Sequence, residues 1–503
     1  MLLVCVRALL ALPLLFFLPG YLLLSNLSLR EKVESRPPWE IAFISLSFSL
    51  LLTSLAALLL AEVGCFSLTK LILVMGLASL ALAILAFRRR RILLHWRITP
   101  GPTEGEAPTH LWLGLILAIS AMLFFLPGEN IWVGRDAGIY VNTGVNLSRT
   151  GSLVLGDDFY SALLAEAHWS YQHHPPTPRG DIHDRLPGFY WVDGEGKALP
   201  QFLHLYPVWI AIFHGLFGLH GALYATPFLA LLCILAIYML GRKLFSPTVG
   251  LLAAILLAMN PGQIWFARYA NSEILFQLFL LTGMWGLAEH LRQGEACTGL
   301  LAGLSLGELL MVRLEGTYLG LVLLVIILYL LLTGELNRKN FWFLVPLGMV
   351  ALWAAGHAYF FSWPYVRLVW RNMALGLGYS SALGLAVALG LALLALVLLL
   401  RLTVGVQRIH SFLSHGQLPT LRLVAALILV SSLVGYFLLP RLGPPETYPL
   451  HWGEVIRSYR EENFLRLGWY LSPWGLWLGL GGVALCILHQ PRKENASTIL
   501  AVL

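Results

Sequence analysis

The sequence predicts an all-α polytopic membrane protein, a bundle of about 13 transmembrane helices. Of its 503 residues, 58% are hydrophobic and 12% are charged, whereas soluble domains carry about 25% charged residues. The mean hydropathy is +0.76. Apolar runs long enough to cross about 30 Å of hydrocarbon recur along the chain.

Each predicted span is an apolar run bounded by polar or turn-forming residues. We place the spans near 2–24, 40–61, 69–87, 109–127, 222–241, 247–261, 273–291, 297–312, 316–333, 341–361, 380–401, 421–439 and 472–489. The first run lacks a small-residue cleavage site, so we interpret it as a retained span and not as a signal peptide. We expect Pro13 and Pro19 to bend it.

Basic residues in the short loops predict the orientation. The strongest cluster is Arg88-Arg89-Arg90-Arg91, which places 88–108 in the cytoplasm. The next span then leads outward, and the long polar loop 128–201 lies outside the cell membrane. The net charge of +7 therefore reflects membrane topology, and we predict no nucleic-acid partner.

Residues 202–218 are apolar enough to span, but a span here would turn Arg242-Lys243 and every later basic loop outward. We therefore predict an interfacial helix over 202–218, which His204 and His214 also favour.

The predicted organisation has four parts: an N-terminal three-helix segment (1–91), a cytoplasmic linker (92–108), a large transmembrane domain (109–489), and a cytoplasmic tail or the start of a truncated further helix (490–503).

Asp136 opens the polar loop in the motif Gly-Arg-Asp-Ala-Gly-Ile-Tyr, residues 134–140. A carboxylate just outside the bilayer can take a proton from a nucleophile at the membrane surface. The alternative is that Asp136 caps a helix beginning at Ala137, because aspartate is a favoured N-cap residue.

Charged residues also stand at two predicted outer turns. These are Arg268, Glu273, Arg313 and Glu315. Arginine outside the membrane runs against the usual charge bias, and a pair of arginines beside an acid would suit a phosphate. The alternative is local pairing of each arginine with its neighbouring glutamate.

The loop offers one candidate metal site, and no other cofactor is predicted. Imidazole and carboxylate groups are ligands for a divalent metal ion, and the loop supplies Asp157, Asp158, His173 and His174. Their spacing follows no strict metal motif, so a solvated loop that faces substrate is the alternative. Farther along, Trp363 and Tyr365 are typical interface anchors.

An exit helix, an aspartate in a short motif, a loop and then His204-Leu-Tyr-Pro207 resemble the GT-C glycosyltransferase superfamily. The resemblance is to the family 39 branch, with protein O-mannosyltransferases and the lipid A aminoarabinose transferase. It covers about 109–340 and does not extend to the N-terminal three-helix segment. Supporting motifs follow in order: Phe217-Gly218, Asn260-Pro261 and the run 301–307.

The resemblance implies a GT-C-like fold and transfer of a sugar, with inversion, from a polyprenyl-phosphate donor to a lipid, glycan or protein acceptor at the outer face. Asp136 matches the family's catalytic acid, although Ala137 follows it where many relatives carry glutamate. The substrate-binding residues are then expected to be Arg135, Tyr140, His204, Tyr206, Arg268, Glu273, Arg313 and Glu315.

The competing hypothesis is a transporter or flippase of lipid-linked sugars. A transporter would carry ionisable residues within its spans, near the membrane midplane. Glu308 is the main acid of that kind, whereas the other candidates cluster at one face. A structural scaffold would leave the acids and histidines of the loop unexplained.

Overall fold

The computed structural model describes residues 11–28, 36–89, 106–129, 136–156, 188–191, 197–317, 338–369 and 472–488, with 9, 131, 162, 185–186, 320 and 327. The chain forms two compact units. All elements below except α21 (Pro473–Leu488) and the first residues of α12 belong to the first unit. The predicted spans 380–401 and 421–439, and the segment 490–503, lie outside the described residues.

The predicted helical fold class is confirmed. Helices lie within a few residues of their predicted positions: α4 (Pro38–Glu62), α5 (Leu68–Arg88), α6 (Glu106–Phe124), α13 (Glu273–Gln293), α14 (Ala296–Val312) and α16 (Phe341–Phe361). Helix α2 (Leu18–Leu27) overlaps only the end of the predicted span 2–24 and extends past it. Among the described residues, 5 helices are long and apolar enough to cross a membrane, or 6 if a bent pair counts as one span. The total of about 13 spans stays a prediction.

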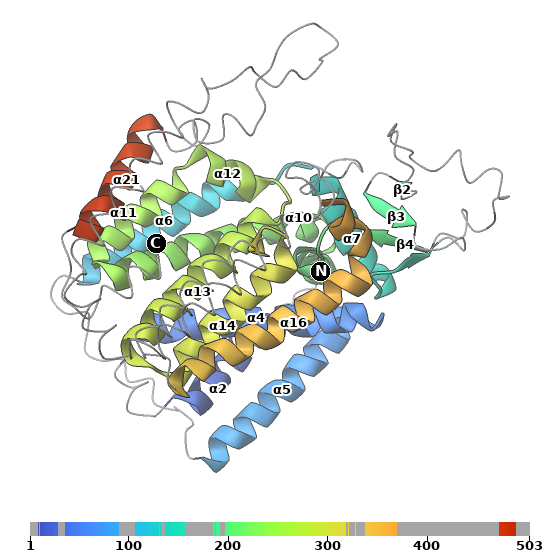
Figure 1. The fold of residues 1–503 in the computed structure, drawn as a ribbon, viewed down its shortest axis with the longest axis horizontal. Coiled ribbons are helices and arrows are strands. Elements are labelled where there is room, and N and C mark those ends of the chain that lie inside the picture. The colour runs from blue at the N-terminus through green and yellow to red at the C-terminus, as the bar shows by residue number, and fades with distance from the viewer. Residues whose placement is uncertain are drawn as a thin grey trace, which may run out of the picture. The chain divides into compact units, whose positions relative to one another are not determined.

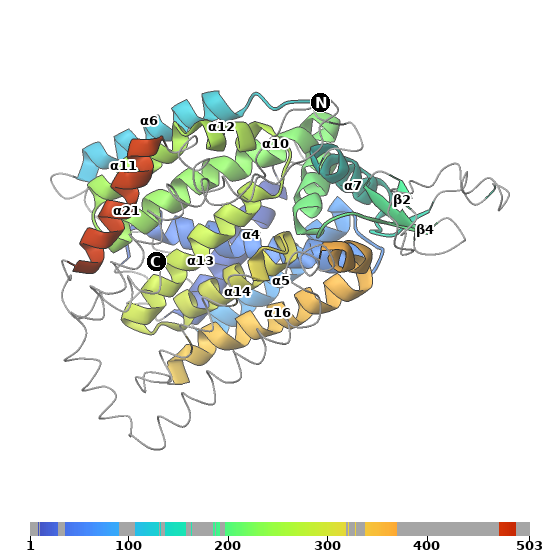
Figure 2. The ribbon, with the colours of Figure 1, turned by 45° about the horizontal axis from the view of Figure 1, so that its top comes forward.

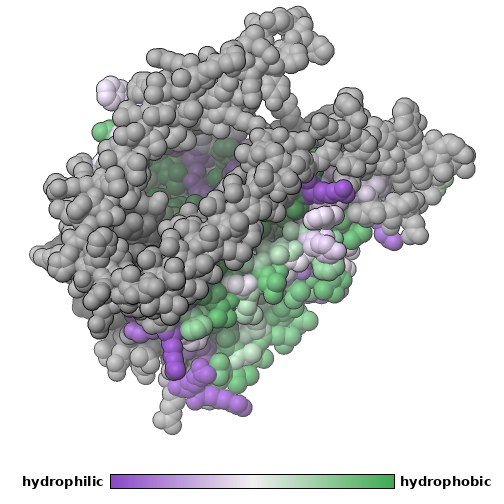
Figure 3. Space-filling view, in the orientation of Figure 1, coloured by the Kyte–Doolittle hydropathy of each residue, from purple (hydrophilic) through white to green (hydrophobic). Residues whose placement is uncertain are grey.

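The outer surfaces of α5 and α16 are apolar. Figure 3 shows a hydrophobic band on this side of the molecule, with hydrophilic residues at both of its ends. Leu77 on α5 is 57% exposed and Leu352 on α16 is 77% exposed. Such a continuous band is unfavourable in water, and hydrocarbon is its natural solvent.

Two clusters of polar residues mark opposite ends of the first unit. At one end, which we call the Glu40 end, Arg36 pairs with Glu40 at 2.5 Å and with Glu295 at 2.6 Å. Helix α4 runs from Glu40 to Glu62, which defines the opposite or Glu62 end. Helix α13 also runs between the two ends. Near its last turn, at the Glu40 end, Glu289 pairs with Lys243 at 2.5 Å.

Helix α10 (Leu205–Leu244) is two helices joined at Gly218, where φ is 73° and ψ is −160°. The hydroxyls of Tyr206 and Thr226 lie 2.5 Å apart, although a straight helix would separate these residues by about 30 Å. The rings of Phe213 and Phe228 are likewise 5.5 Å apart. The chain therefore folds back at Gly218, and residues 205–217 pack against residues 219–244.

The helix 205–217 stays at the Glu62 end. Its N-cap, His204, bonds to His357, which in turn bonds to Glu62. Near its other end, Gly215 lies against Leu68, the first residue of α5. A helix of this length is about 20 Å long, shorter than the ~30 Å of hydrocarbon. The interfacial position of this helix stays a prediction.

The loop 128–201 contains a helix and a small sheet. Helix α7 (Asp136–Thr150) is the helix that the alternative for Asp136 required. The four short antiparallel strands that follow, in the order β1-β4-β3-β2, were not predicted. They are β1 (Leu155–Gly156), β2 (Arg185–Leu186), β3 (Phe189–Trp191) and β4 (Lys197–Pro200). The sheet lies beside α7 at one end of the helices (Figures 1 and 2). Gly144 of α7 permits a close approach, since a Cβ there would lie 2.5 Å from Ile210 of α10.

A second correction concerns the predicted span 247–261 and the turn after it. Helix α11 (Pro247–Ala258) ends earlier, and α12 (Pro261–Arg268) follows it at a bend of 62°. Pro261 has no backbone N–H and disfavours helical backbone at Asn260. The Asn-Pro pair therefore ends one helix and begins another.

Candidate functional site

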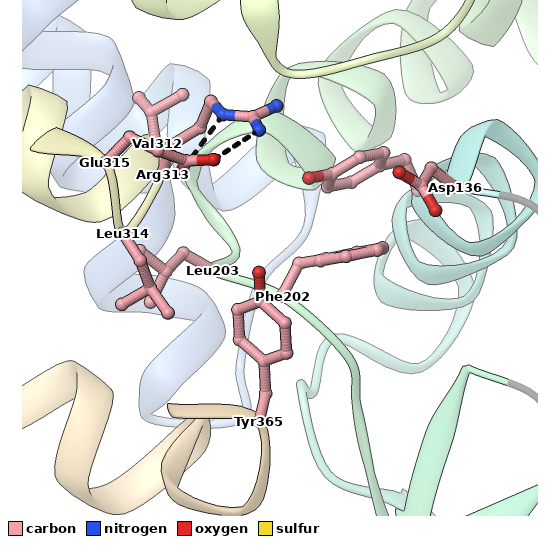
Figure 4. Close-up of a pocket in the computed structure, with 9 residues that line it drawn as sticks. Asp136, Phe202, Leu203, Val312, Arg313, Leu314, Glu315 and Tyr365 are labelled. Carbon is pink, nitrogen blue, oxygen red and sulfur yellow. Dashed lines mark hydrogen bonds and ion pairs between the residues drawn. The ribbon is translucent and has the colours of Figure 1, made fainter. Parts of the chain in front are cut away.

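A pocket at the Glu62 end collects residues from four parts of the chain. They come from the start of α7, the segment after β4, the turn after α14 and the chain after α16 (Figure 4). The pocket encloses about 270 Å³ of space that no atom fills, part of it open to solvent. It is lined by Asp136, Tyr140, Phe202, Leu203, Val312, Arg313, Leu314, Glu315 and Tyr365.

Arg313 is the centre of a charged cluster on one side of the pocket. It holds Glu315 through two hydrogen bonds, from Nε at 3.2 Å and from Nη2 at 2.8 Å. Its Nη1 donates to Glu273, the first residue of α13, at 2.5 Å. The same Nη1 lies 3.3 Å from Ser272 Oγ, which is 3.0 Å from the Tyr140 hydroxyl. Arg313 therefore pairs with nearby glutamates, which is the alternative that the sequence analysis left open.

Asp136 stands on the opposite side of the pocket from Arg313, as Figure 4 shows. It lies in the first turn of α7 and is exposed. Within the described part of the chain, its carboxylate has no hydrogen-bond or ion-pair partner. An unpaired carboxylate in this position is free to accept a proton from a bound group.

Aromatic rings form the wall between Asp136 and Arg313. The Phe202 ring stacks on Tyr140 at 4.7 Å and meets Tyr365 edge-on at 5.2 Å. Phe202 has φ 79°, in the left-handed region. A bulky residue is strained there and persists only when its surroundings hold it. The stacked rings therefore fix the backbone at the base of the pocket.

The paired charges shift the titration of the lining groups. Burial raises the pKa of the Glu315 carboxyl, but the Arg313 guanidinium lowers it more, so the net shift is downward. Burial alone would lower the pKa of Arg313, and the two glutamates raise it above its ordinary value. Burial raises the pKa of Tyr365 to about 12. Arg313 and Glu315 are therefore charged and Tyr365 is neutral near neutral pH.

Four predicted binding residues lie outside the pocket lining. Glu273 is one of them and contacts a lining residue, Arg313. His204 is buried behind it and bonds to His357 at 3.1 Å and to the Pro200 carbonyl at 3.3 Å. Burial and the neighbouring His357 lower the pKa of His204 to about 3. Tyr206 is also buried, against Thr226. Arg268 donates from Nε to the Leu123 carbonyl at 2.6 Å, which ties α12 to α6.

The remaining predicted residues cannot be placed. Arg135 lies outside the described residues, and so do all four proposed metal ligands, Asp157, Asp158, His173 and His174. Within the described ranges, no group of three or more His, Cys, Asp or Glu residues could hold a metal ion.

Sequence reasoning missed several residues of the site. Tyr365 was interpreted as an interface anchor, and it lines the pocket. Phe202 carried no signal, because a phenylalanine in an apolar run is ordinary. Glu62 and His357 were also missed, although an acid at the end of a span and a histidine inside another are the kind of residue that marks a site in a membrane.

Comparison with known proteins finds a family match for the central part of the chain. Residues 205–360 match the family model described as dolichyl-phosphate-mannose-protein mannosyltransferase. The predicted resemblance to GT-C glycosyltransferases is confirmed over these residues. The matched region contains Glu273, Arg313, Glu315 and His357, whereas Asp136 precedes it. No curated protein sequence matches the chain.

Solved structures of two GT-C proteins are similar at low sequence identity. The archaeal oligosaccharyltransferase AglB from Archaeoglobus fulgidus, in complex with an inhibitory peptide and a dolichol-phosphate, has 16% identity and a TM-score of 0.36, covering 79% of this chain and 50% of that chain. ArnT from Cupriavidus metallidurans, bound to undecaprenyl phosphate, has 14% identity and a TM-score of 0.34, covering 79% and 75%. The chain thus spans about half the length of the oligosaccharyltransferase.

Proposed function

We propose that the protein is an integral-membrane glycosyltransferase that moves a sugar from a polyprenyl-phosphate donor to an acceptor at the outer face of the membrane. The observation that carries the proposal is the pocket. In it, Asp136, an exposed carboxylate without a partner among the described residues, faces the guanidinium of Arg313 and its paired glutamates across an aromatic wall. The family model matched by residues 205–360 supports the same class of reaction.

In the proposed reaction, Asp136 is the general base. It takes the proton of the acceptor group, whose freed electron pair attacks the anomeric carbon of the donor sugar. The bond between that carbon and the phosphate oxygen breaks, and polyprenyl phosphate leaves with the electron pair. Attack opposite the leaving group inverts the anomeric centre. The acceptor is a lipid, a glycan or a protein.

Arg313 is the proposed partner of the donor phosphate. Both sides of its guanidinium are already engaged, because Glu273 and Glu315 accept from it. Glu315 is the more exposed of the two, with 53% of its side chain accessible against 32% for Glu273. We therefore propose that a phosphate displaces Glu315, since a guanidinium binds carboxylate and phosphate with the same fork.

The experiment is transfer by purified protein in lipid nanodiscs. Labelled polyprenyl-phosphate sugars and an unlabelled membrane extract are supplied, and label is sought in a new product. Transfer that requires both donor and protein is the expected result. Movement of labelled donor across proteoliposomes with no new product would instead support the transporter or flippase.

A further inference from the structure

A relay of three side chains lies directly behind the pocket. The Glu62 carboxylate is 2.6 Å from Nδ1 of His357 on α16. His357 Nε2 is 3.1 Å from Nδ1 of His204. The His204 Nε2 atom is 3.3 Å from the carbonyl oxygen of Pro200. Trp353 Nε1 also donates to both oxygens of Glu62, at 3.1 and 2.9 Å. The relay thus joins the end of α4 to the segment after β4.

Donor and acceptor rules fix where the protons sit. The Pro200 carbonyl can only accept, so His204 Nε2 must carry the proton, and Nδ1 of a neutral His204 must accept. His357 Nε2 then has to donate. The contact with Glu62 uses the other ring nitrogen of His357. The complete relay therefore holds one extra proton, shared between His357 and the Glu62 carboxylate.

The pocket side of the relay is a strained segment. His204 donates a hydrogen bond to the carbonyl of Pro200. Phe202, with its φ of 79°, lies between these two residues in the chain. Phe202 and Leu203 both line the pocket. The Ser362 hydroxyl, 3.5 Å from His204 Nδ1, connects the same ring to the chain that carries Tyr365. A change in the orientation of His204 would therefore move the pocket wall.

We infer that Glu62 is a positioning residue of the pocket, acting through His357 and His204 on Phe202 and Leu203. The N-terminal three-helix segment is then part of the working site, although the family resemblance does not extend to it. Two further contacts join this segment to the site: Ser54 accepts from Trp209 at 2.9 Å, and the Phe66 amide donates to the Gly151 carbonyl at 2.9 Å.

The relay is buried, so each of its polar groups needs a hydrogen-bond or ion-pair partner. The side chain of His357 is fully buried and that of Glu62 is 12% exposed. Removing one partner of such a pair leaves a buried charge or a buried polar group without its partner. Glu62→Leu removes the carboxylate, so His357 Nδ1 loses its partner and Trp353 Nε1 loses its acceptor. Glu62→Gln instead preserves the relay, because its amide NH2 can donate to His357 Nδ1 while its oxygen accepts from Trp353.

A thiol-protection experiment tests the inference without any activity. Leu203 is 1% exposed, so the thiol of L203C should be protected while the segment is held. The background replaces Cys5, Cys65 and Cys486 with serine. We expect L203C to react at least tenfold faster with a maleimide when E62L is added, and E62Q to keep much of the protection.

Glu40→Leu is the matched control. Glu40 lies on the same helix and is also in an ion pair, with Arg36, but at the Glu40 end. Equal protection of L203C with and without E62L would overturn the inference. Equal loss of protection in E62L and E40L would also overturn it, because the effect would then be general unfolding.

The second measurement is the turnover number per folded protein, and it rests on the proposed function. E62L should lower kcat by up to about 100-fold, as small misplacements of a site do, with the KM for donor changed less than threefold. E62Q should keep most of the turnover. If the wild type transfers no sugar but L203C still depends on Glu62, the relay stands and the proposed function falls.

Discussion

At the residue scale, the position of Asp136 makes a direct prediction. Asparagine has the same shape as aspartate but cannot accept the acceptor's proton, so Asp136→Asn should slow transfer by about 100- to 10,000-fold. Asp136 is exposed and unpaired within the described chain, so the thermal unfolding of the Asp136→Asn variant should match that of the wild type. Initial rates with labelled donor check the prediction. A folded variant with ordinary turnover would remove Asp136 from the mechanism.

The same substitution, arginine to lysine, distinguishes the role of Arg313 from that of Arg268. Lysine cannot reproduce the two-pronged contact with Glu315 or with a phosphate, so Arg313→Lys should raise the KM for donor about tenfold. Arg268 donates to the Leu123 carbonyl and does not line the pocket, so Arg268→Lys should leave that KM unchanged. Donor saturation curves decide between them. An equal effect in both variants would place the donor elsewhere.

Part of the site could be predicted from single residues. Asp136, Arg313 and Glu315 stood out because charge is rare in this chain and its place at a turn is visible in the sequence. The relay could not be predicted, since Glu62 and His357 are 295 residues apart. Hydropathy gives the limits of a span but not the direction of its side chains, so it could not bring these two residues together.

At the scale of elements, Gly218 is the point where α10 reverses. Its backbone angles are those that only glycine adopts readily, and no atom lies within 4 Å of a Cβ placed there. Gly218→Ala should therefore destabilise the protein by about 1–3 kcal/mol through the backbone alone. Thermal unfolding in detergent measures the change.

Gly76→Ala is the control for Gly218→Ala. Gly76 lies inside α5, and a Cβ there also meets nothing within 4 Å. Alanine favours a helix by about 0.5–1 kcal/mol over glycine, so this variant should be neutral or slightly more stable. Equal destabilisation by the two substitutions would show that Gly218 is not a special position.

The elements differ in how well the sequence predicts them. The spans were found because a membrane helix must satisfy its backbone internally and so needs a long apolar run. The four strands were missed because each is only 2 to 4 residues long. Such short strands show no alternating pattern. Helix α12 was missed for the same reason, because it has only 8 residues.

At the scale of the whole molecule, the two ends predict the sidedness. Cys65 lies three residues after Glu62, at the end that carries the pocket, and Phe245 follows Lys243 at the Glu40 end. In intact cells, a membrane-impermeant thiol reagent should label Cys65 and leave F245C unlabelled until the membrane is opened. Proteins that keep only one of these thiols give clean signals. The reverse pattern would place the pocket in the cytoplasm.

The long reach of the Glu62–His357 contact has a consequence for biosynthesis. A ribosome adds about 5–20 residues each second, so the 295 residues between these partners take about 15–60 s to make. Throughout that interval, the end of α4 has neither Trp353 nor His357 to satisfy its carboxylate. The newly made N-terminal helices therefore lack these contacts until α16 has been synthesised. A factor that shields membrane helices during translation would act on this protein in that window.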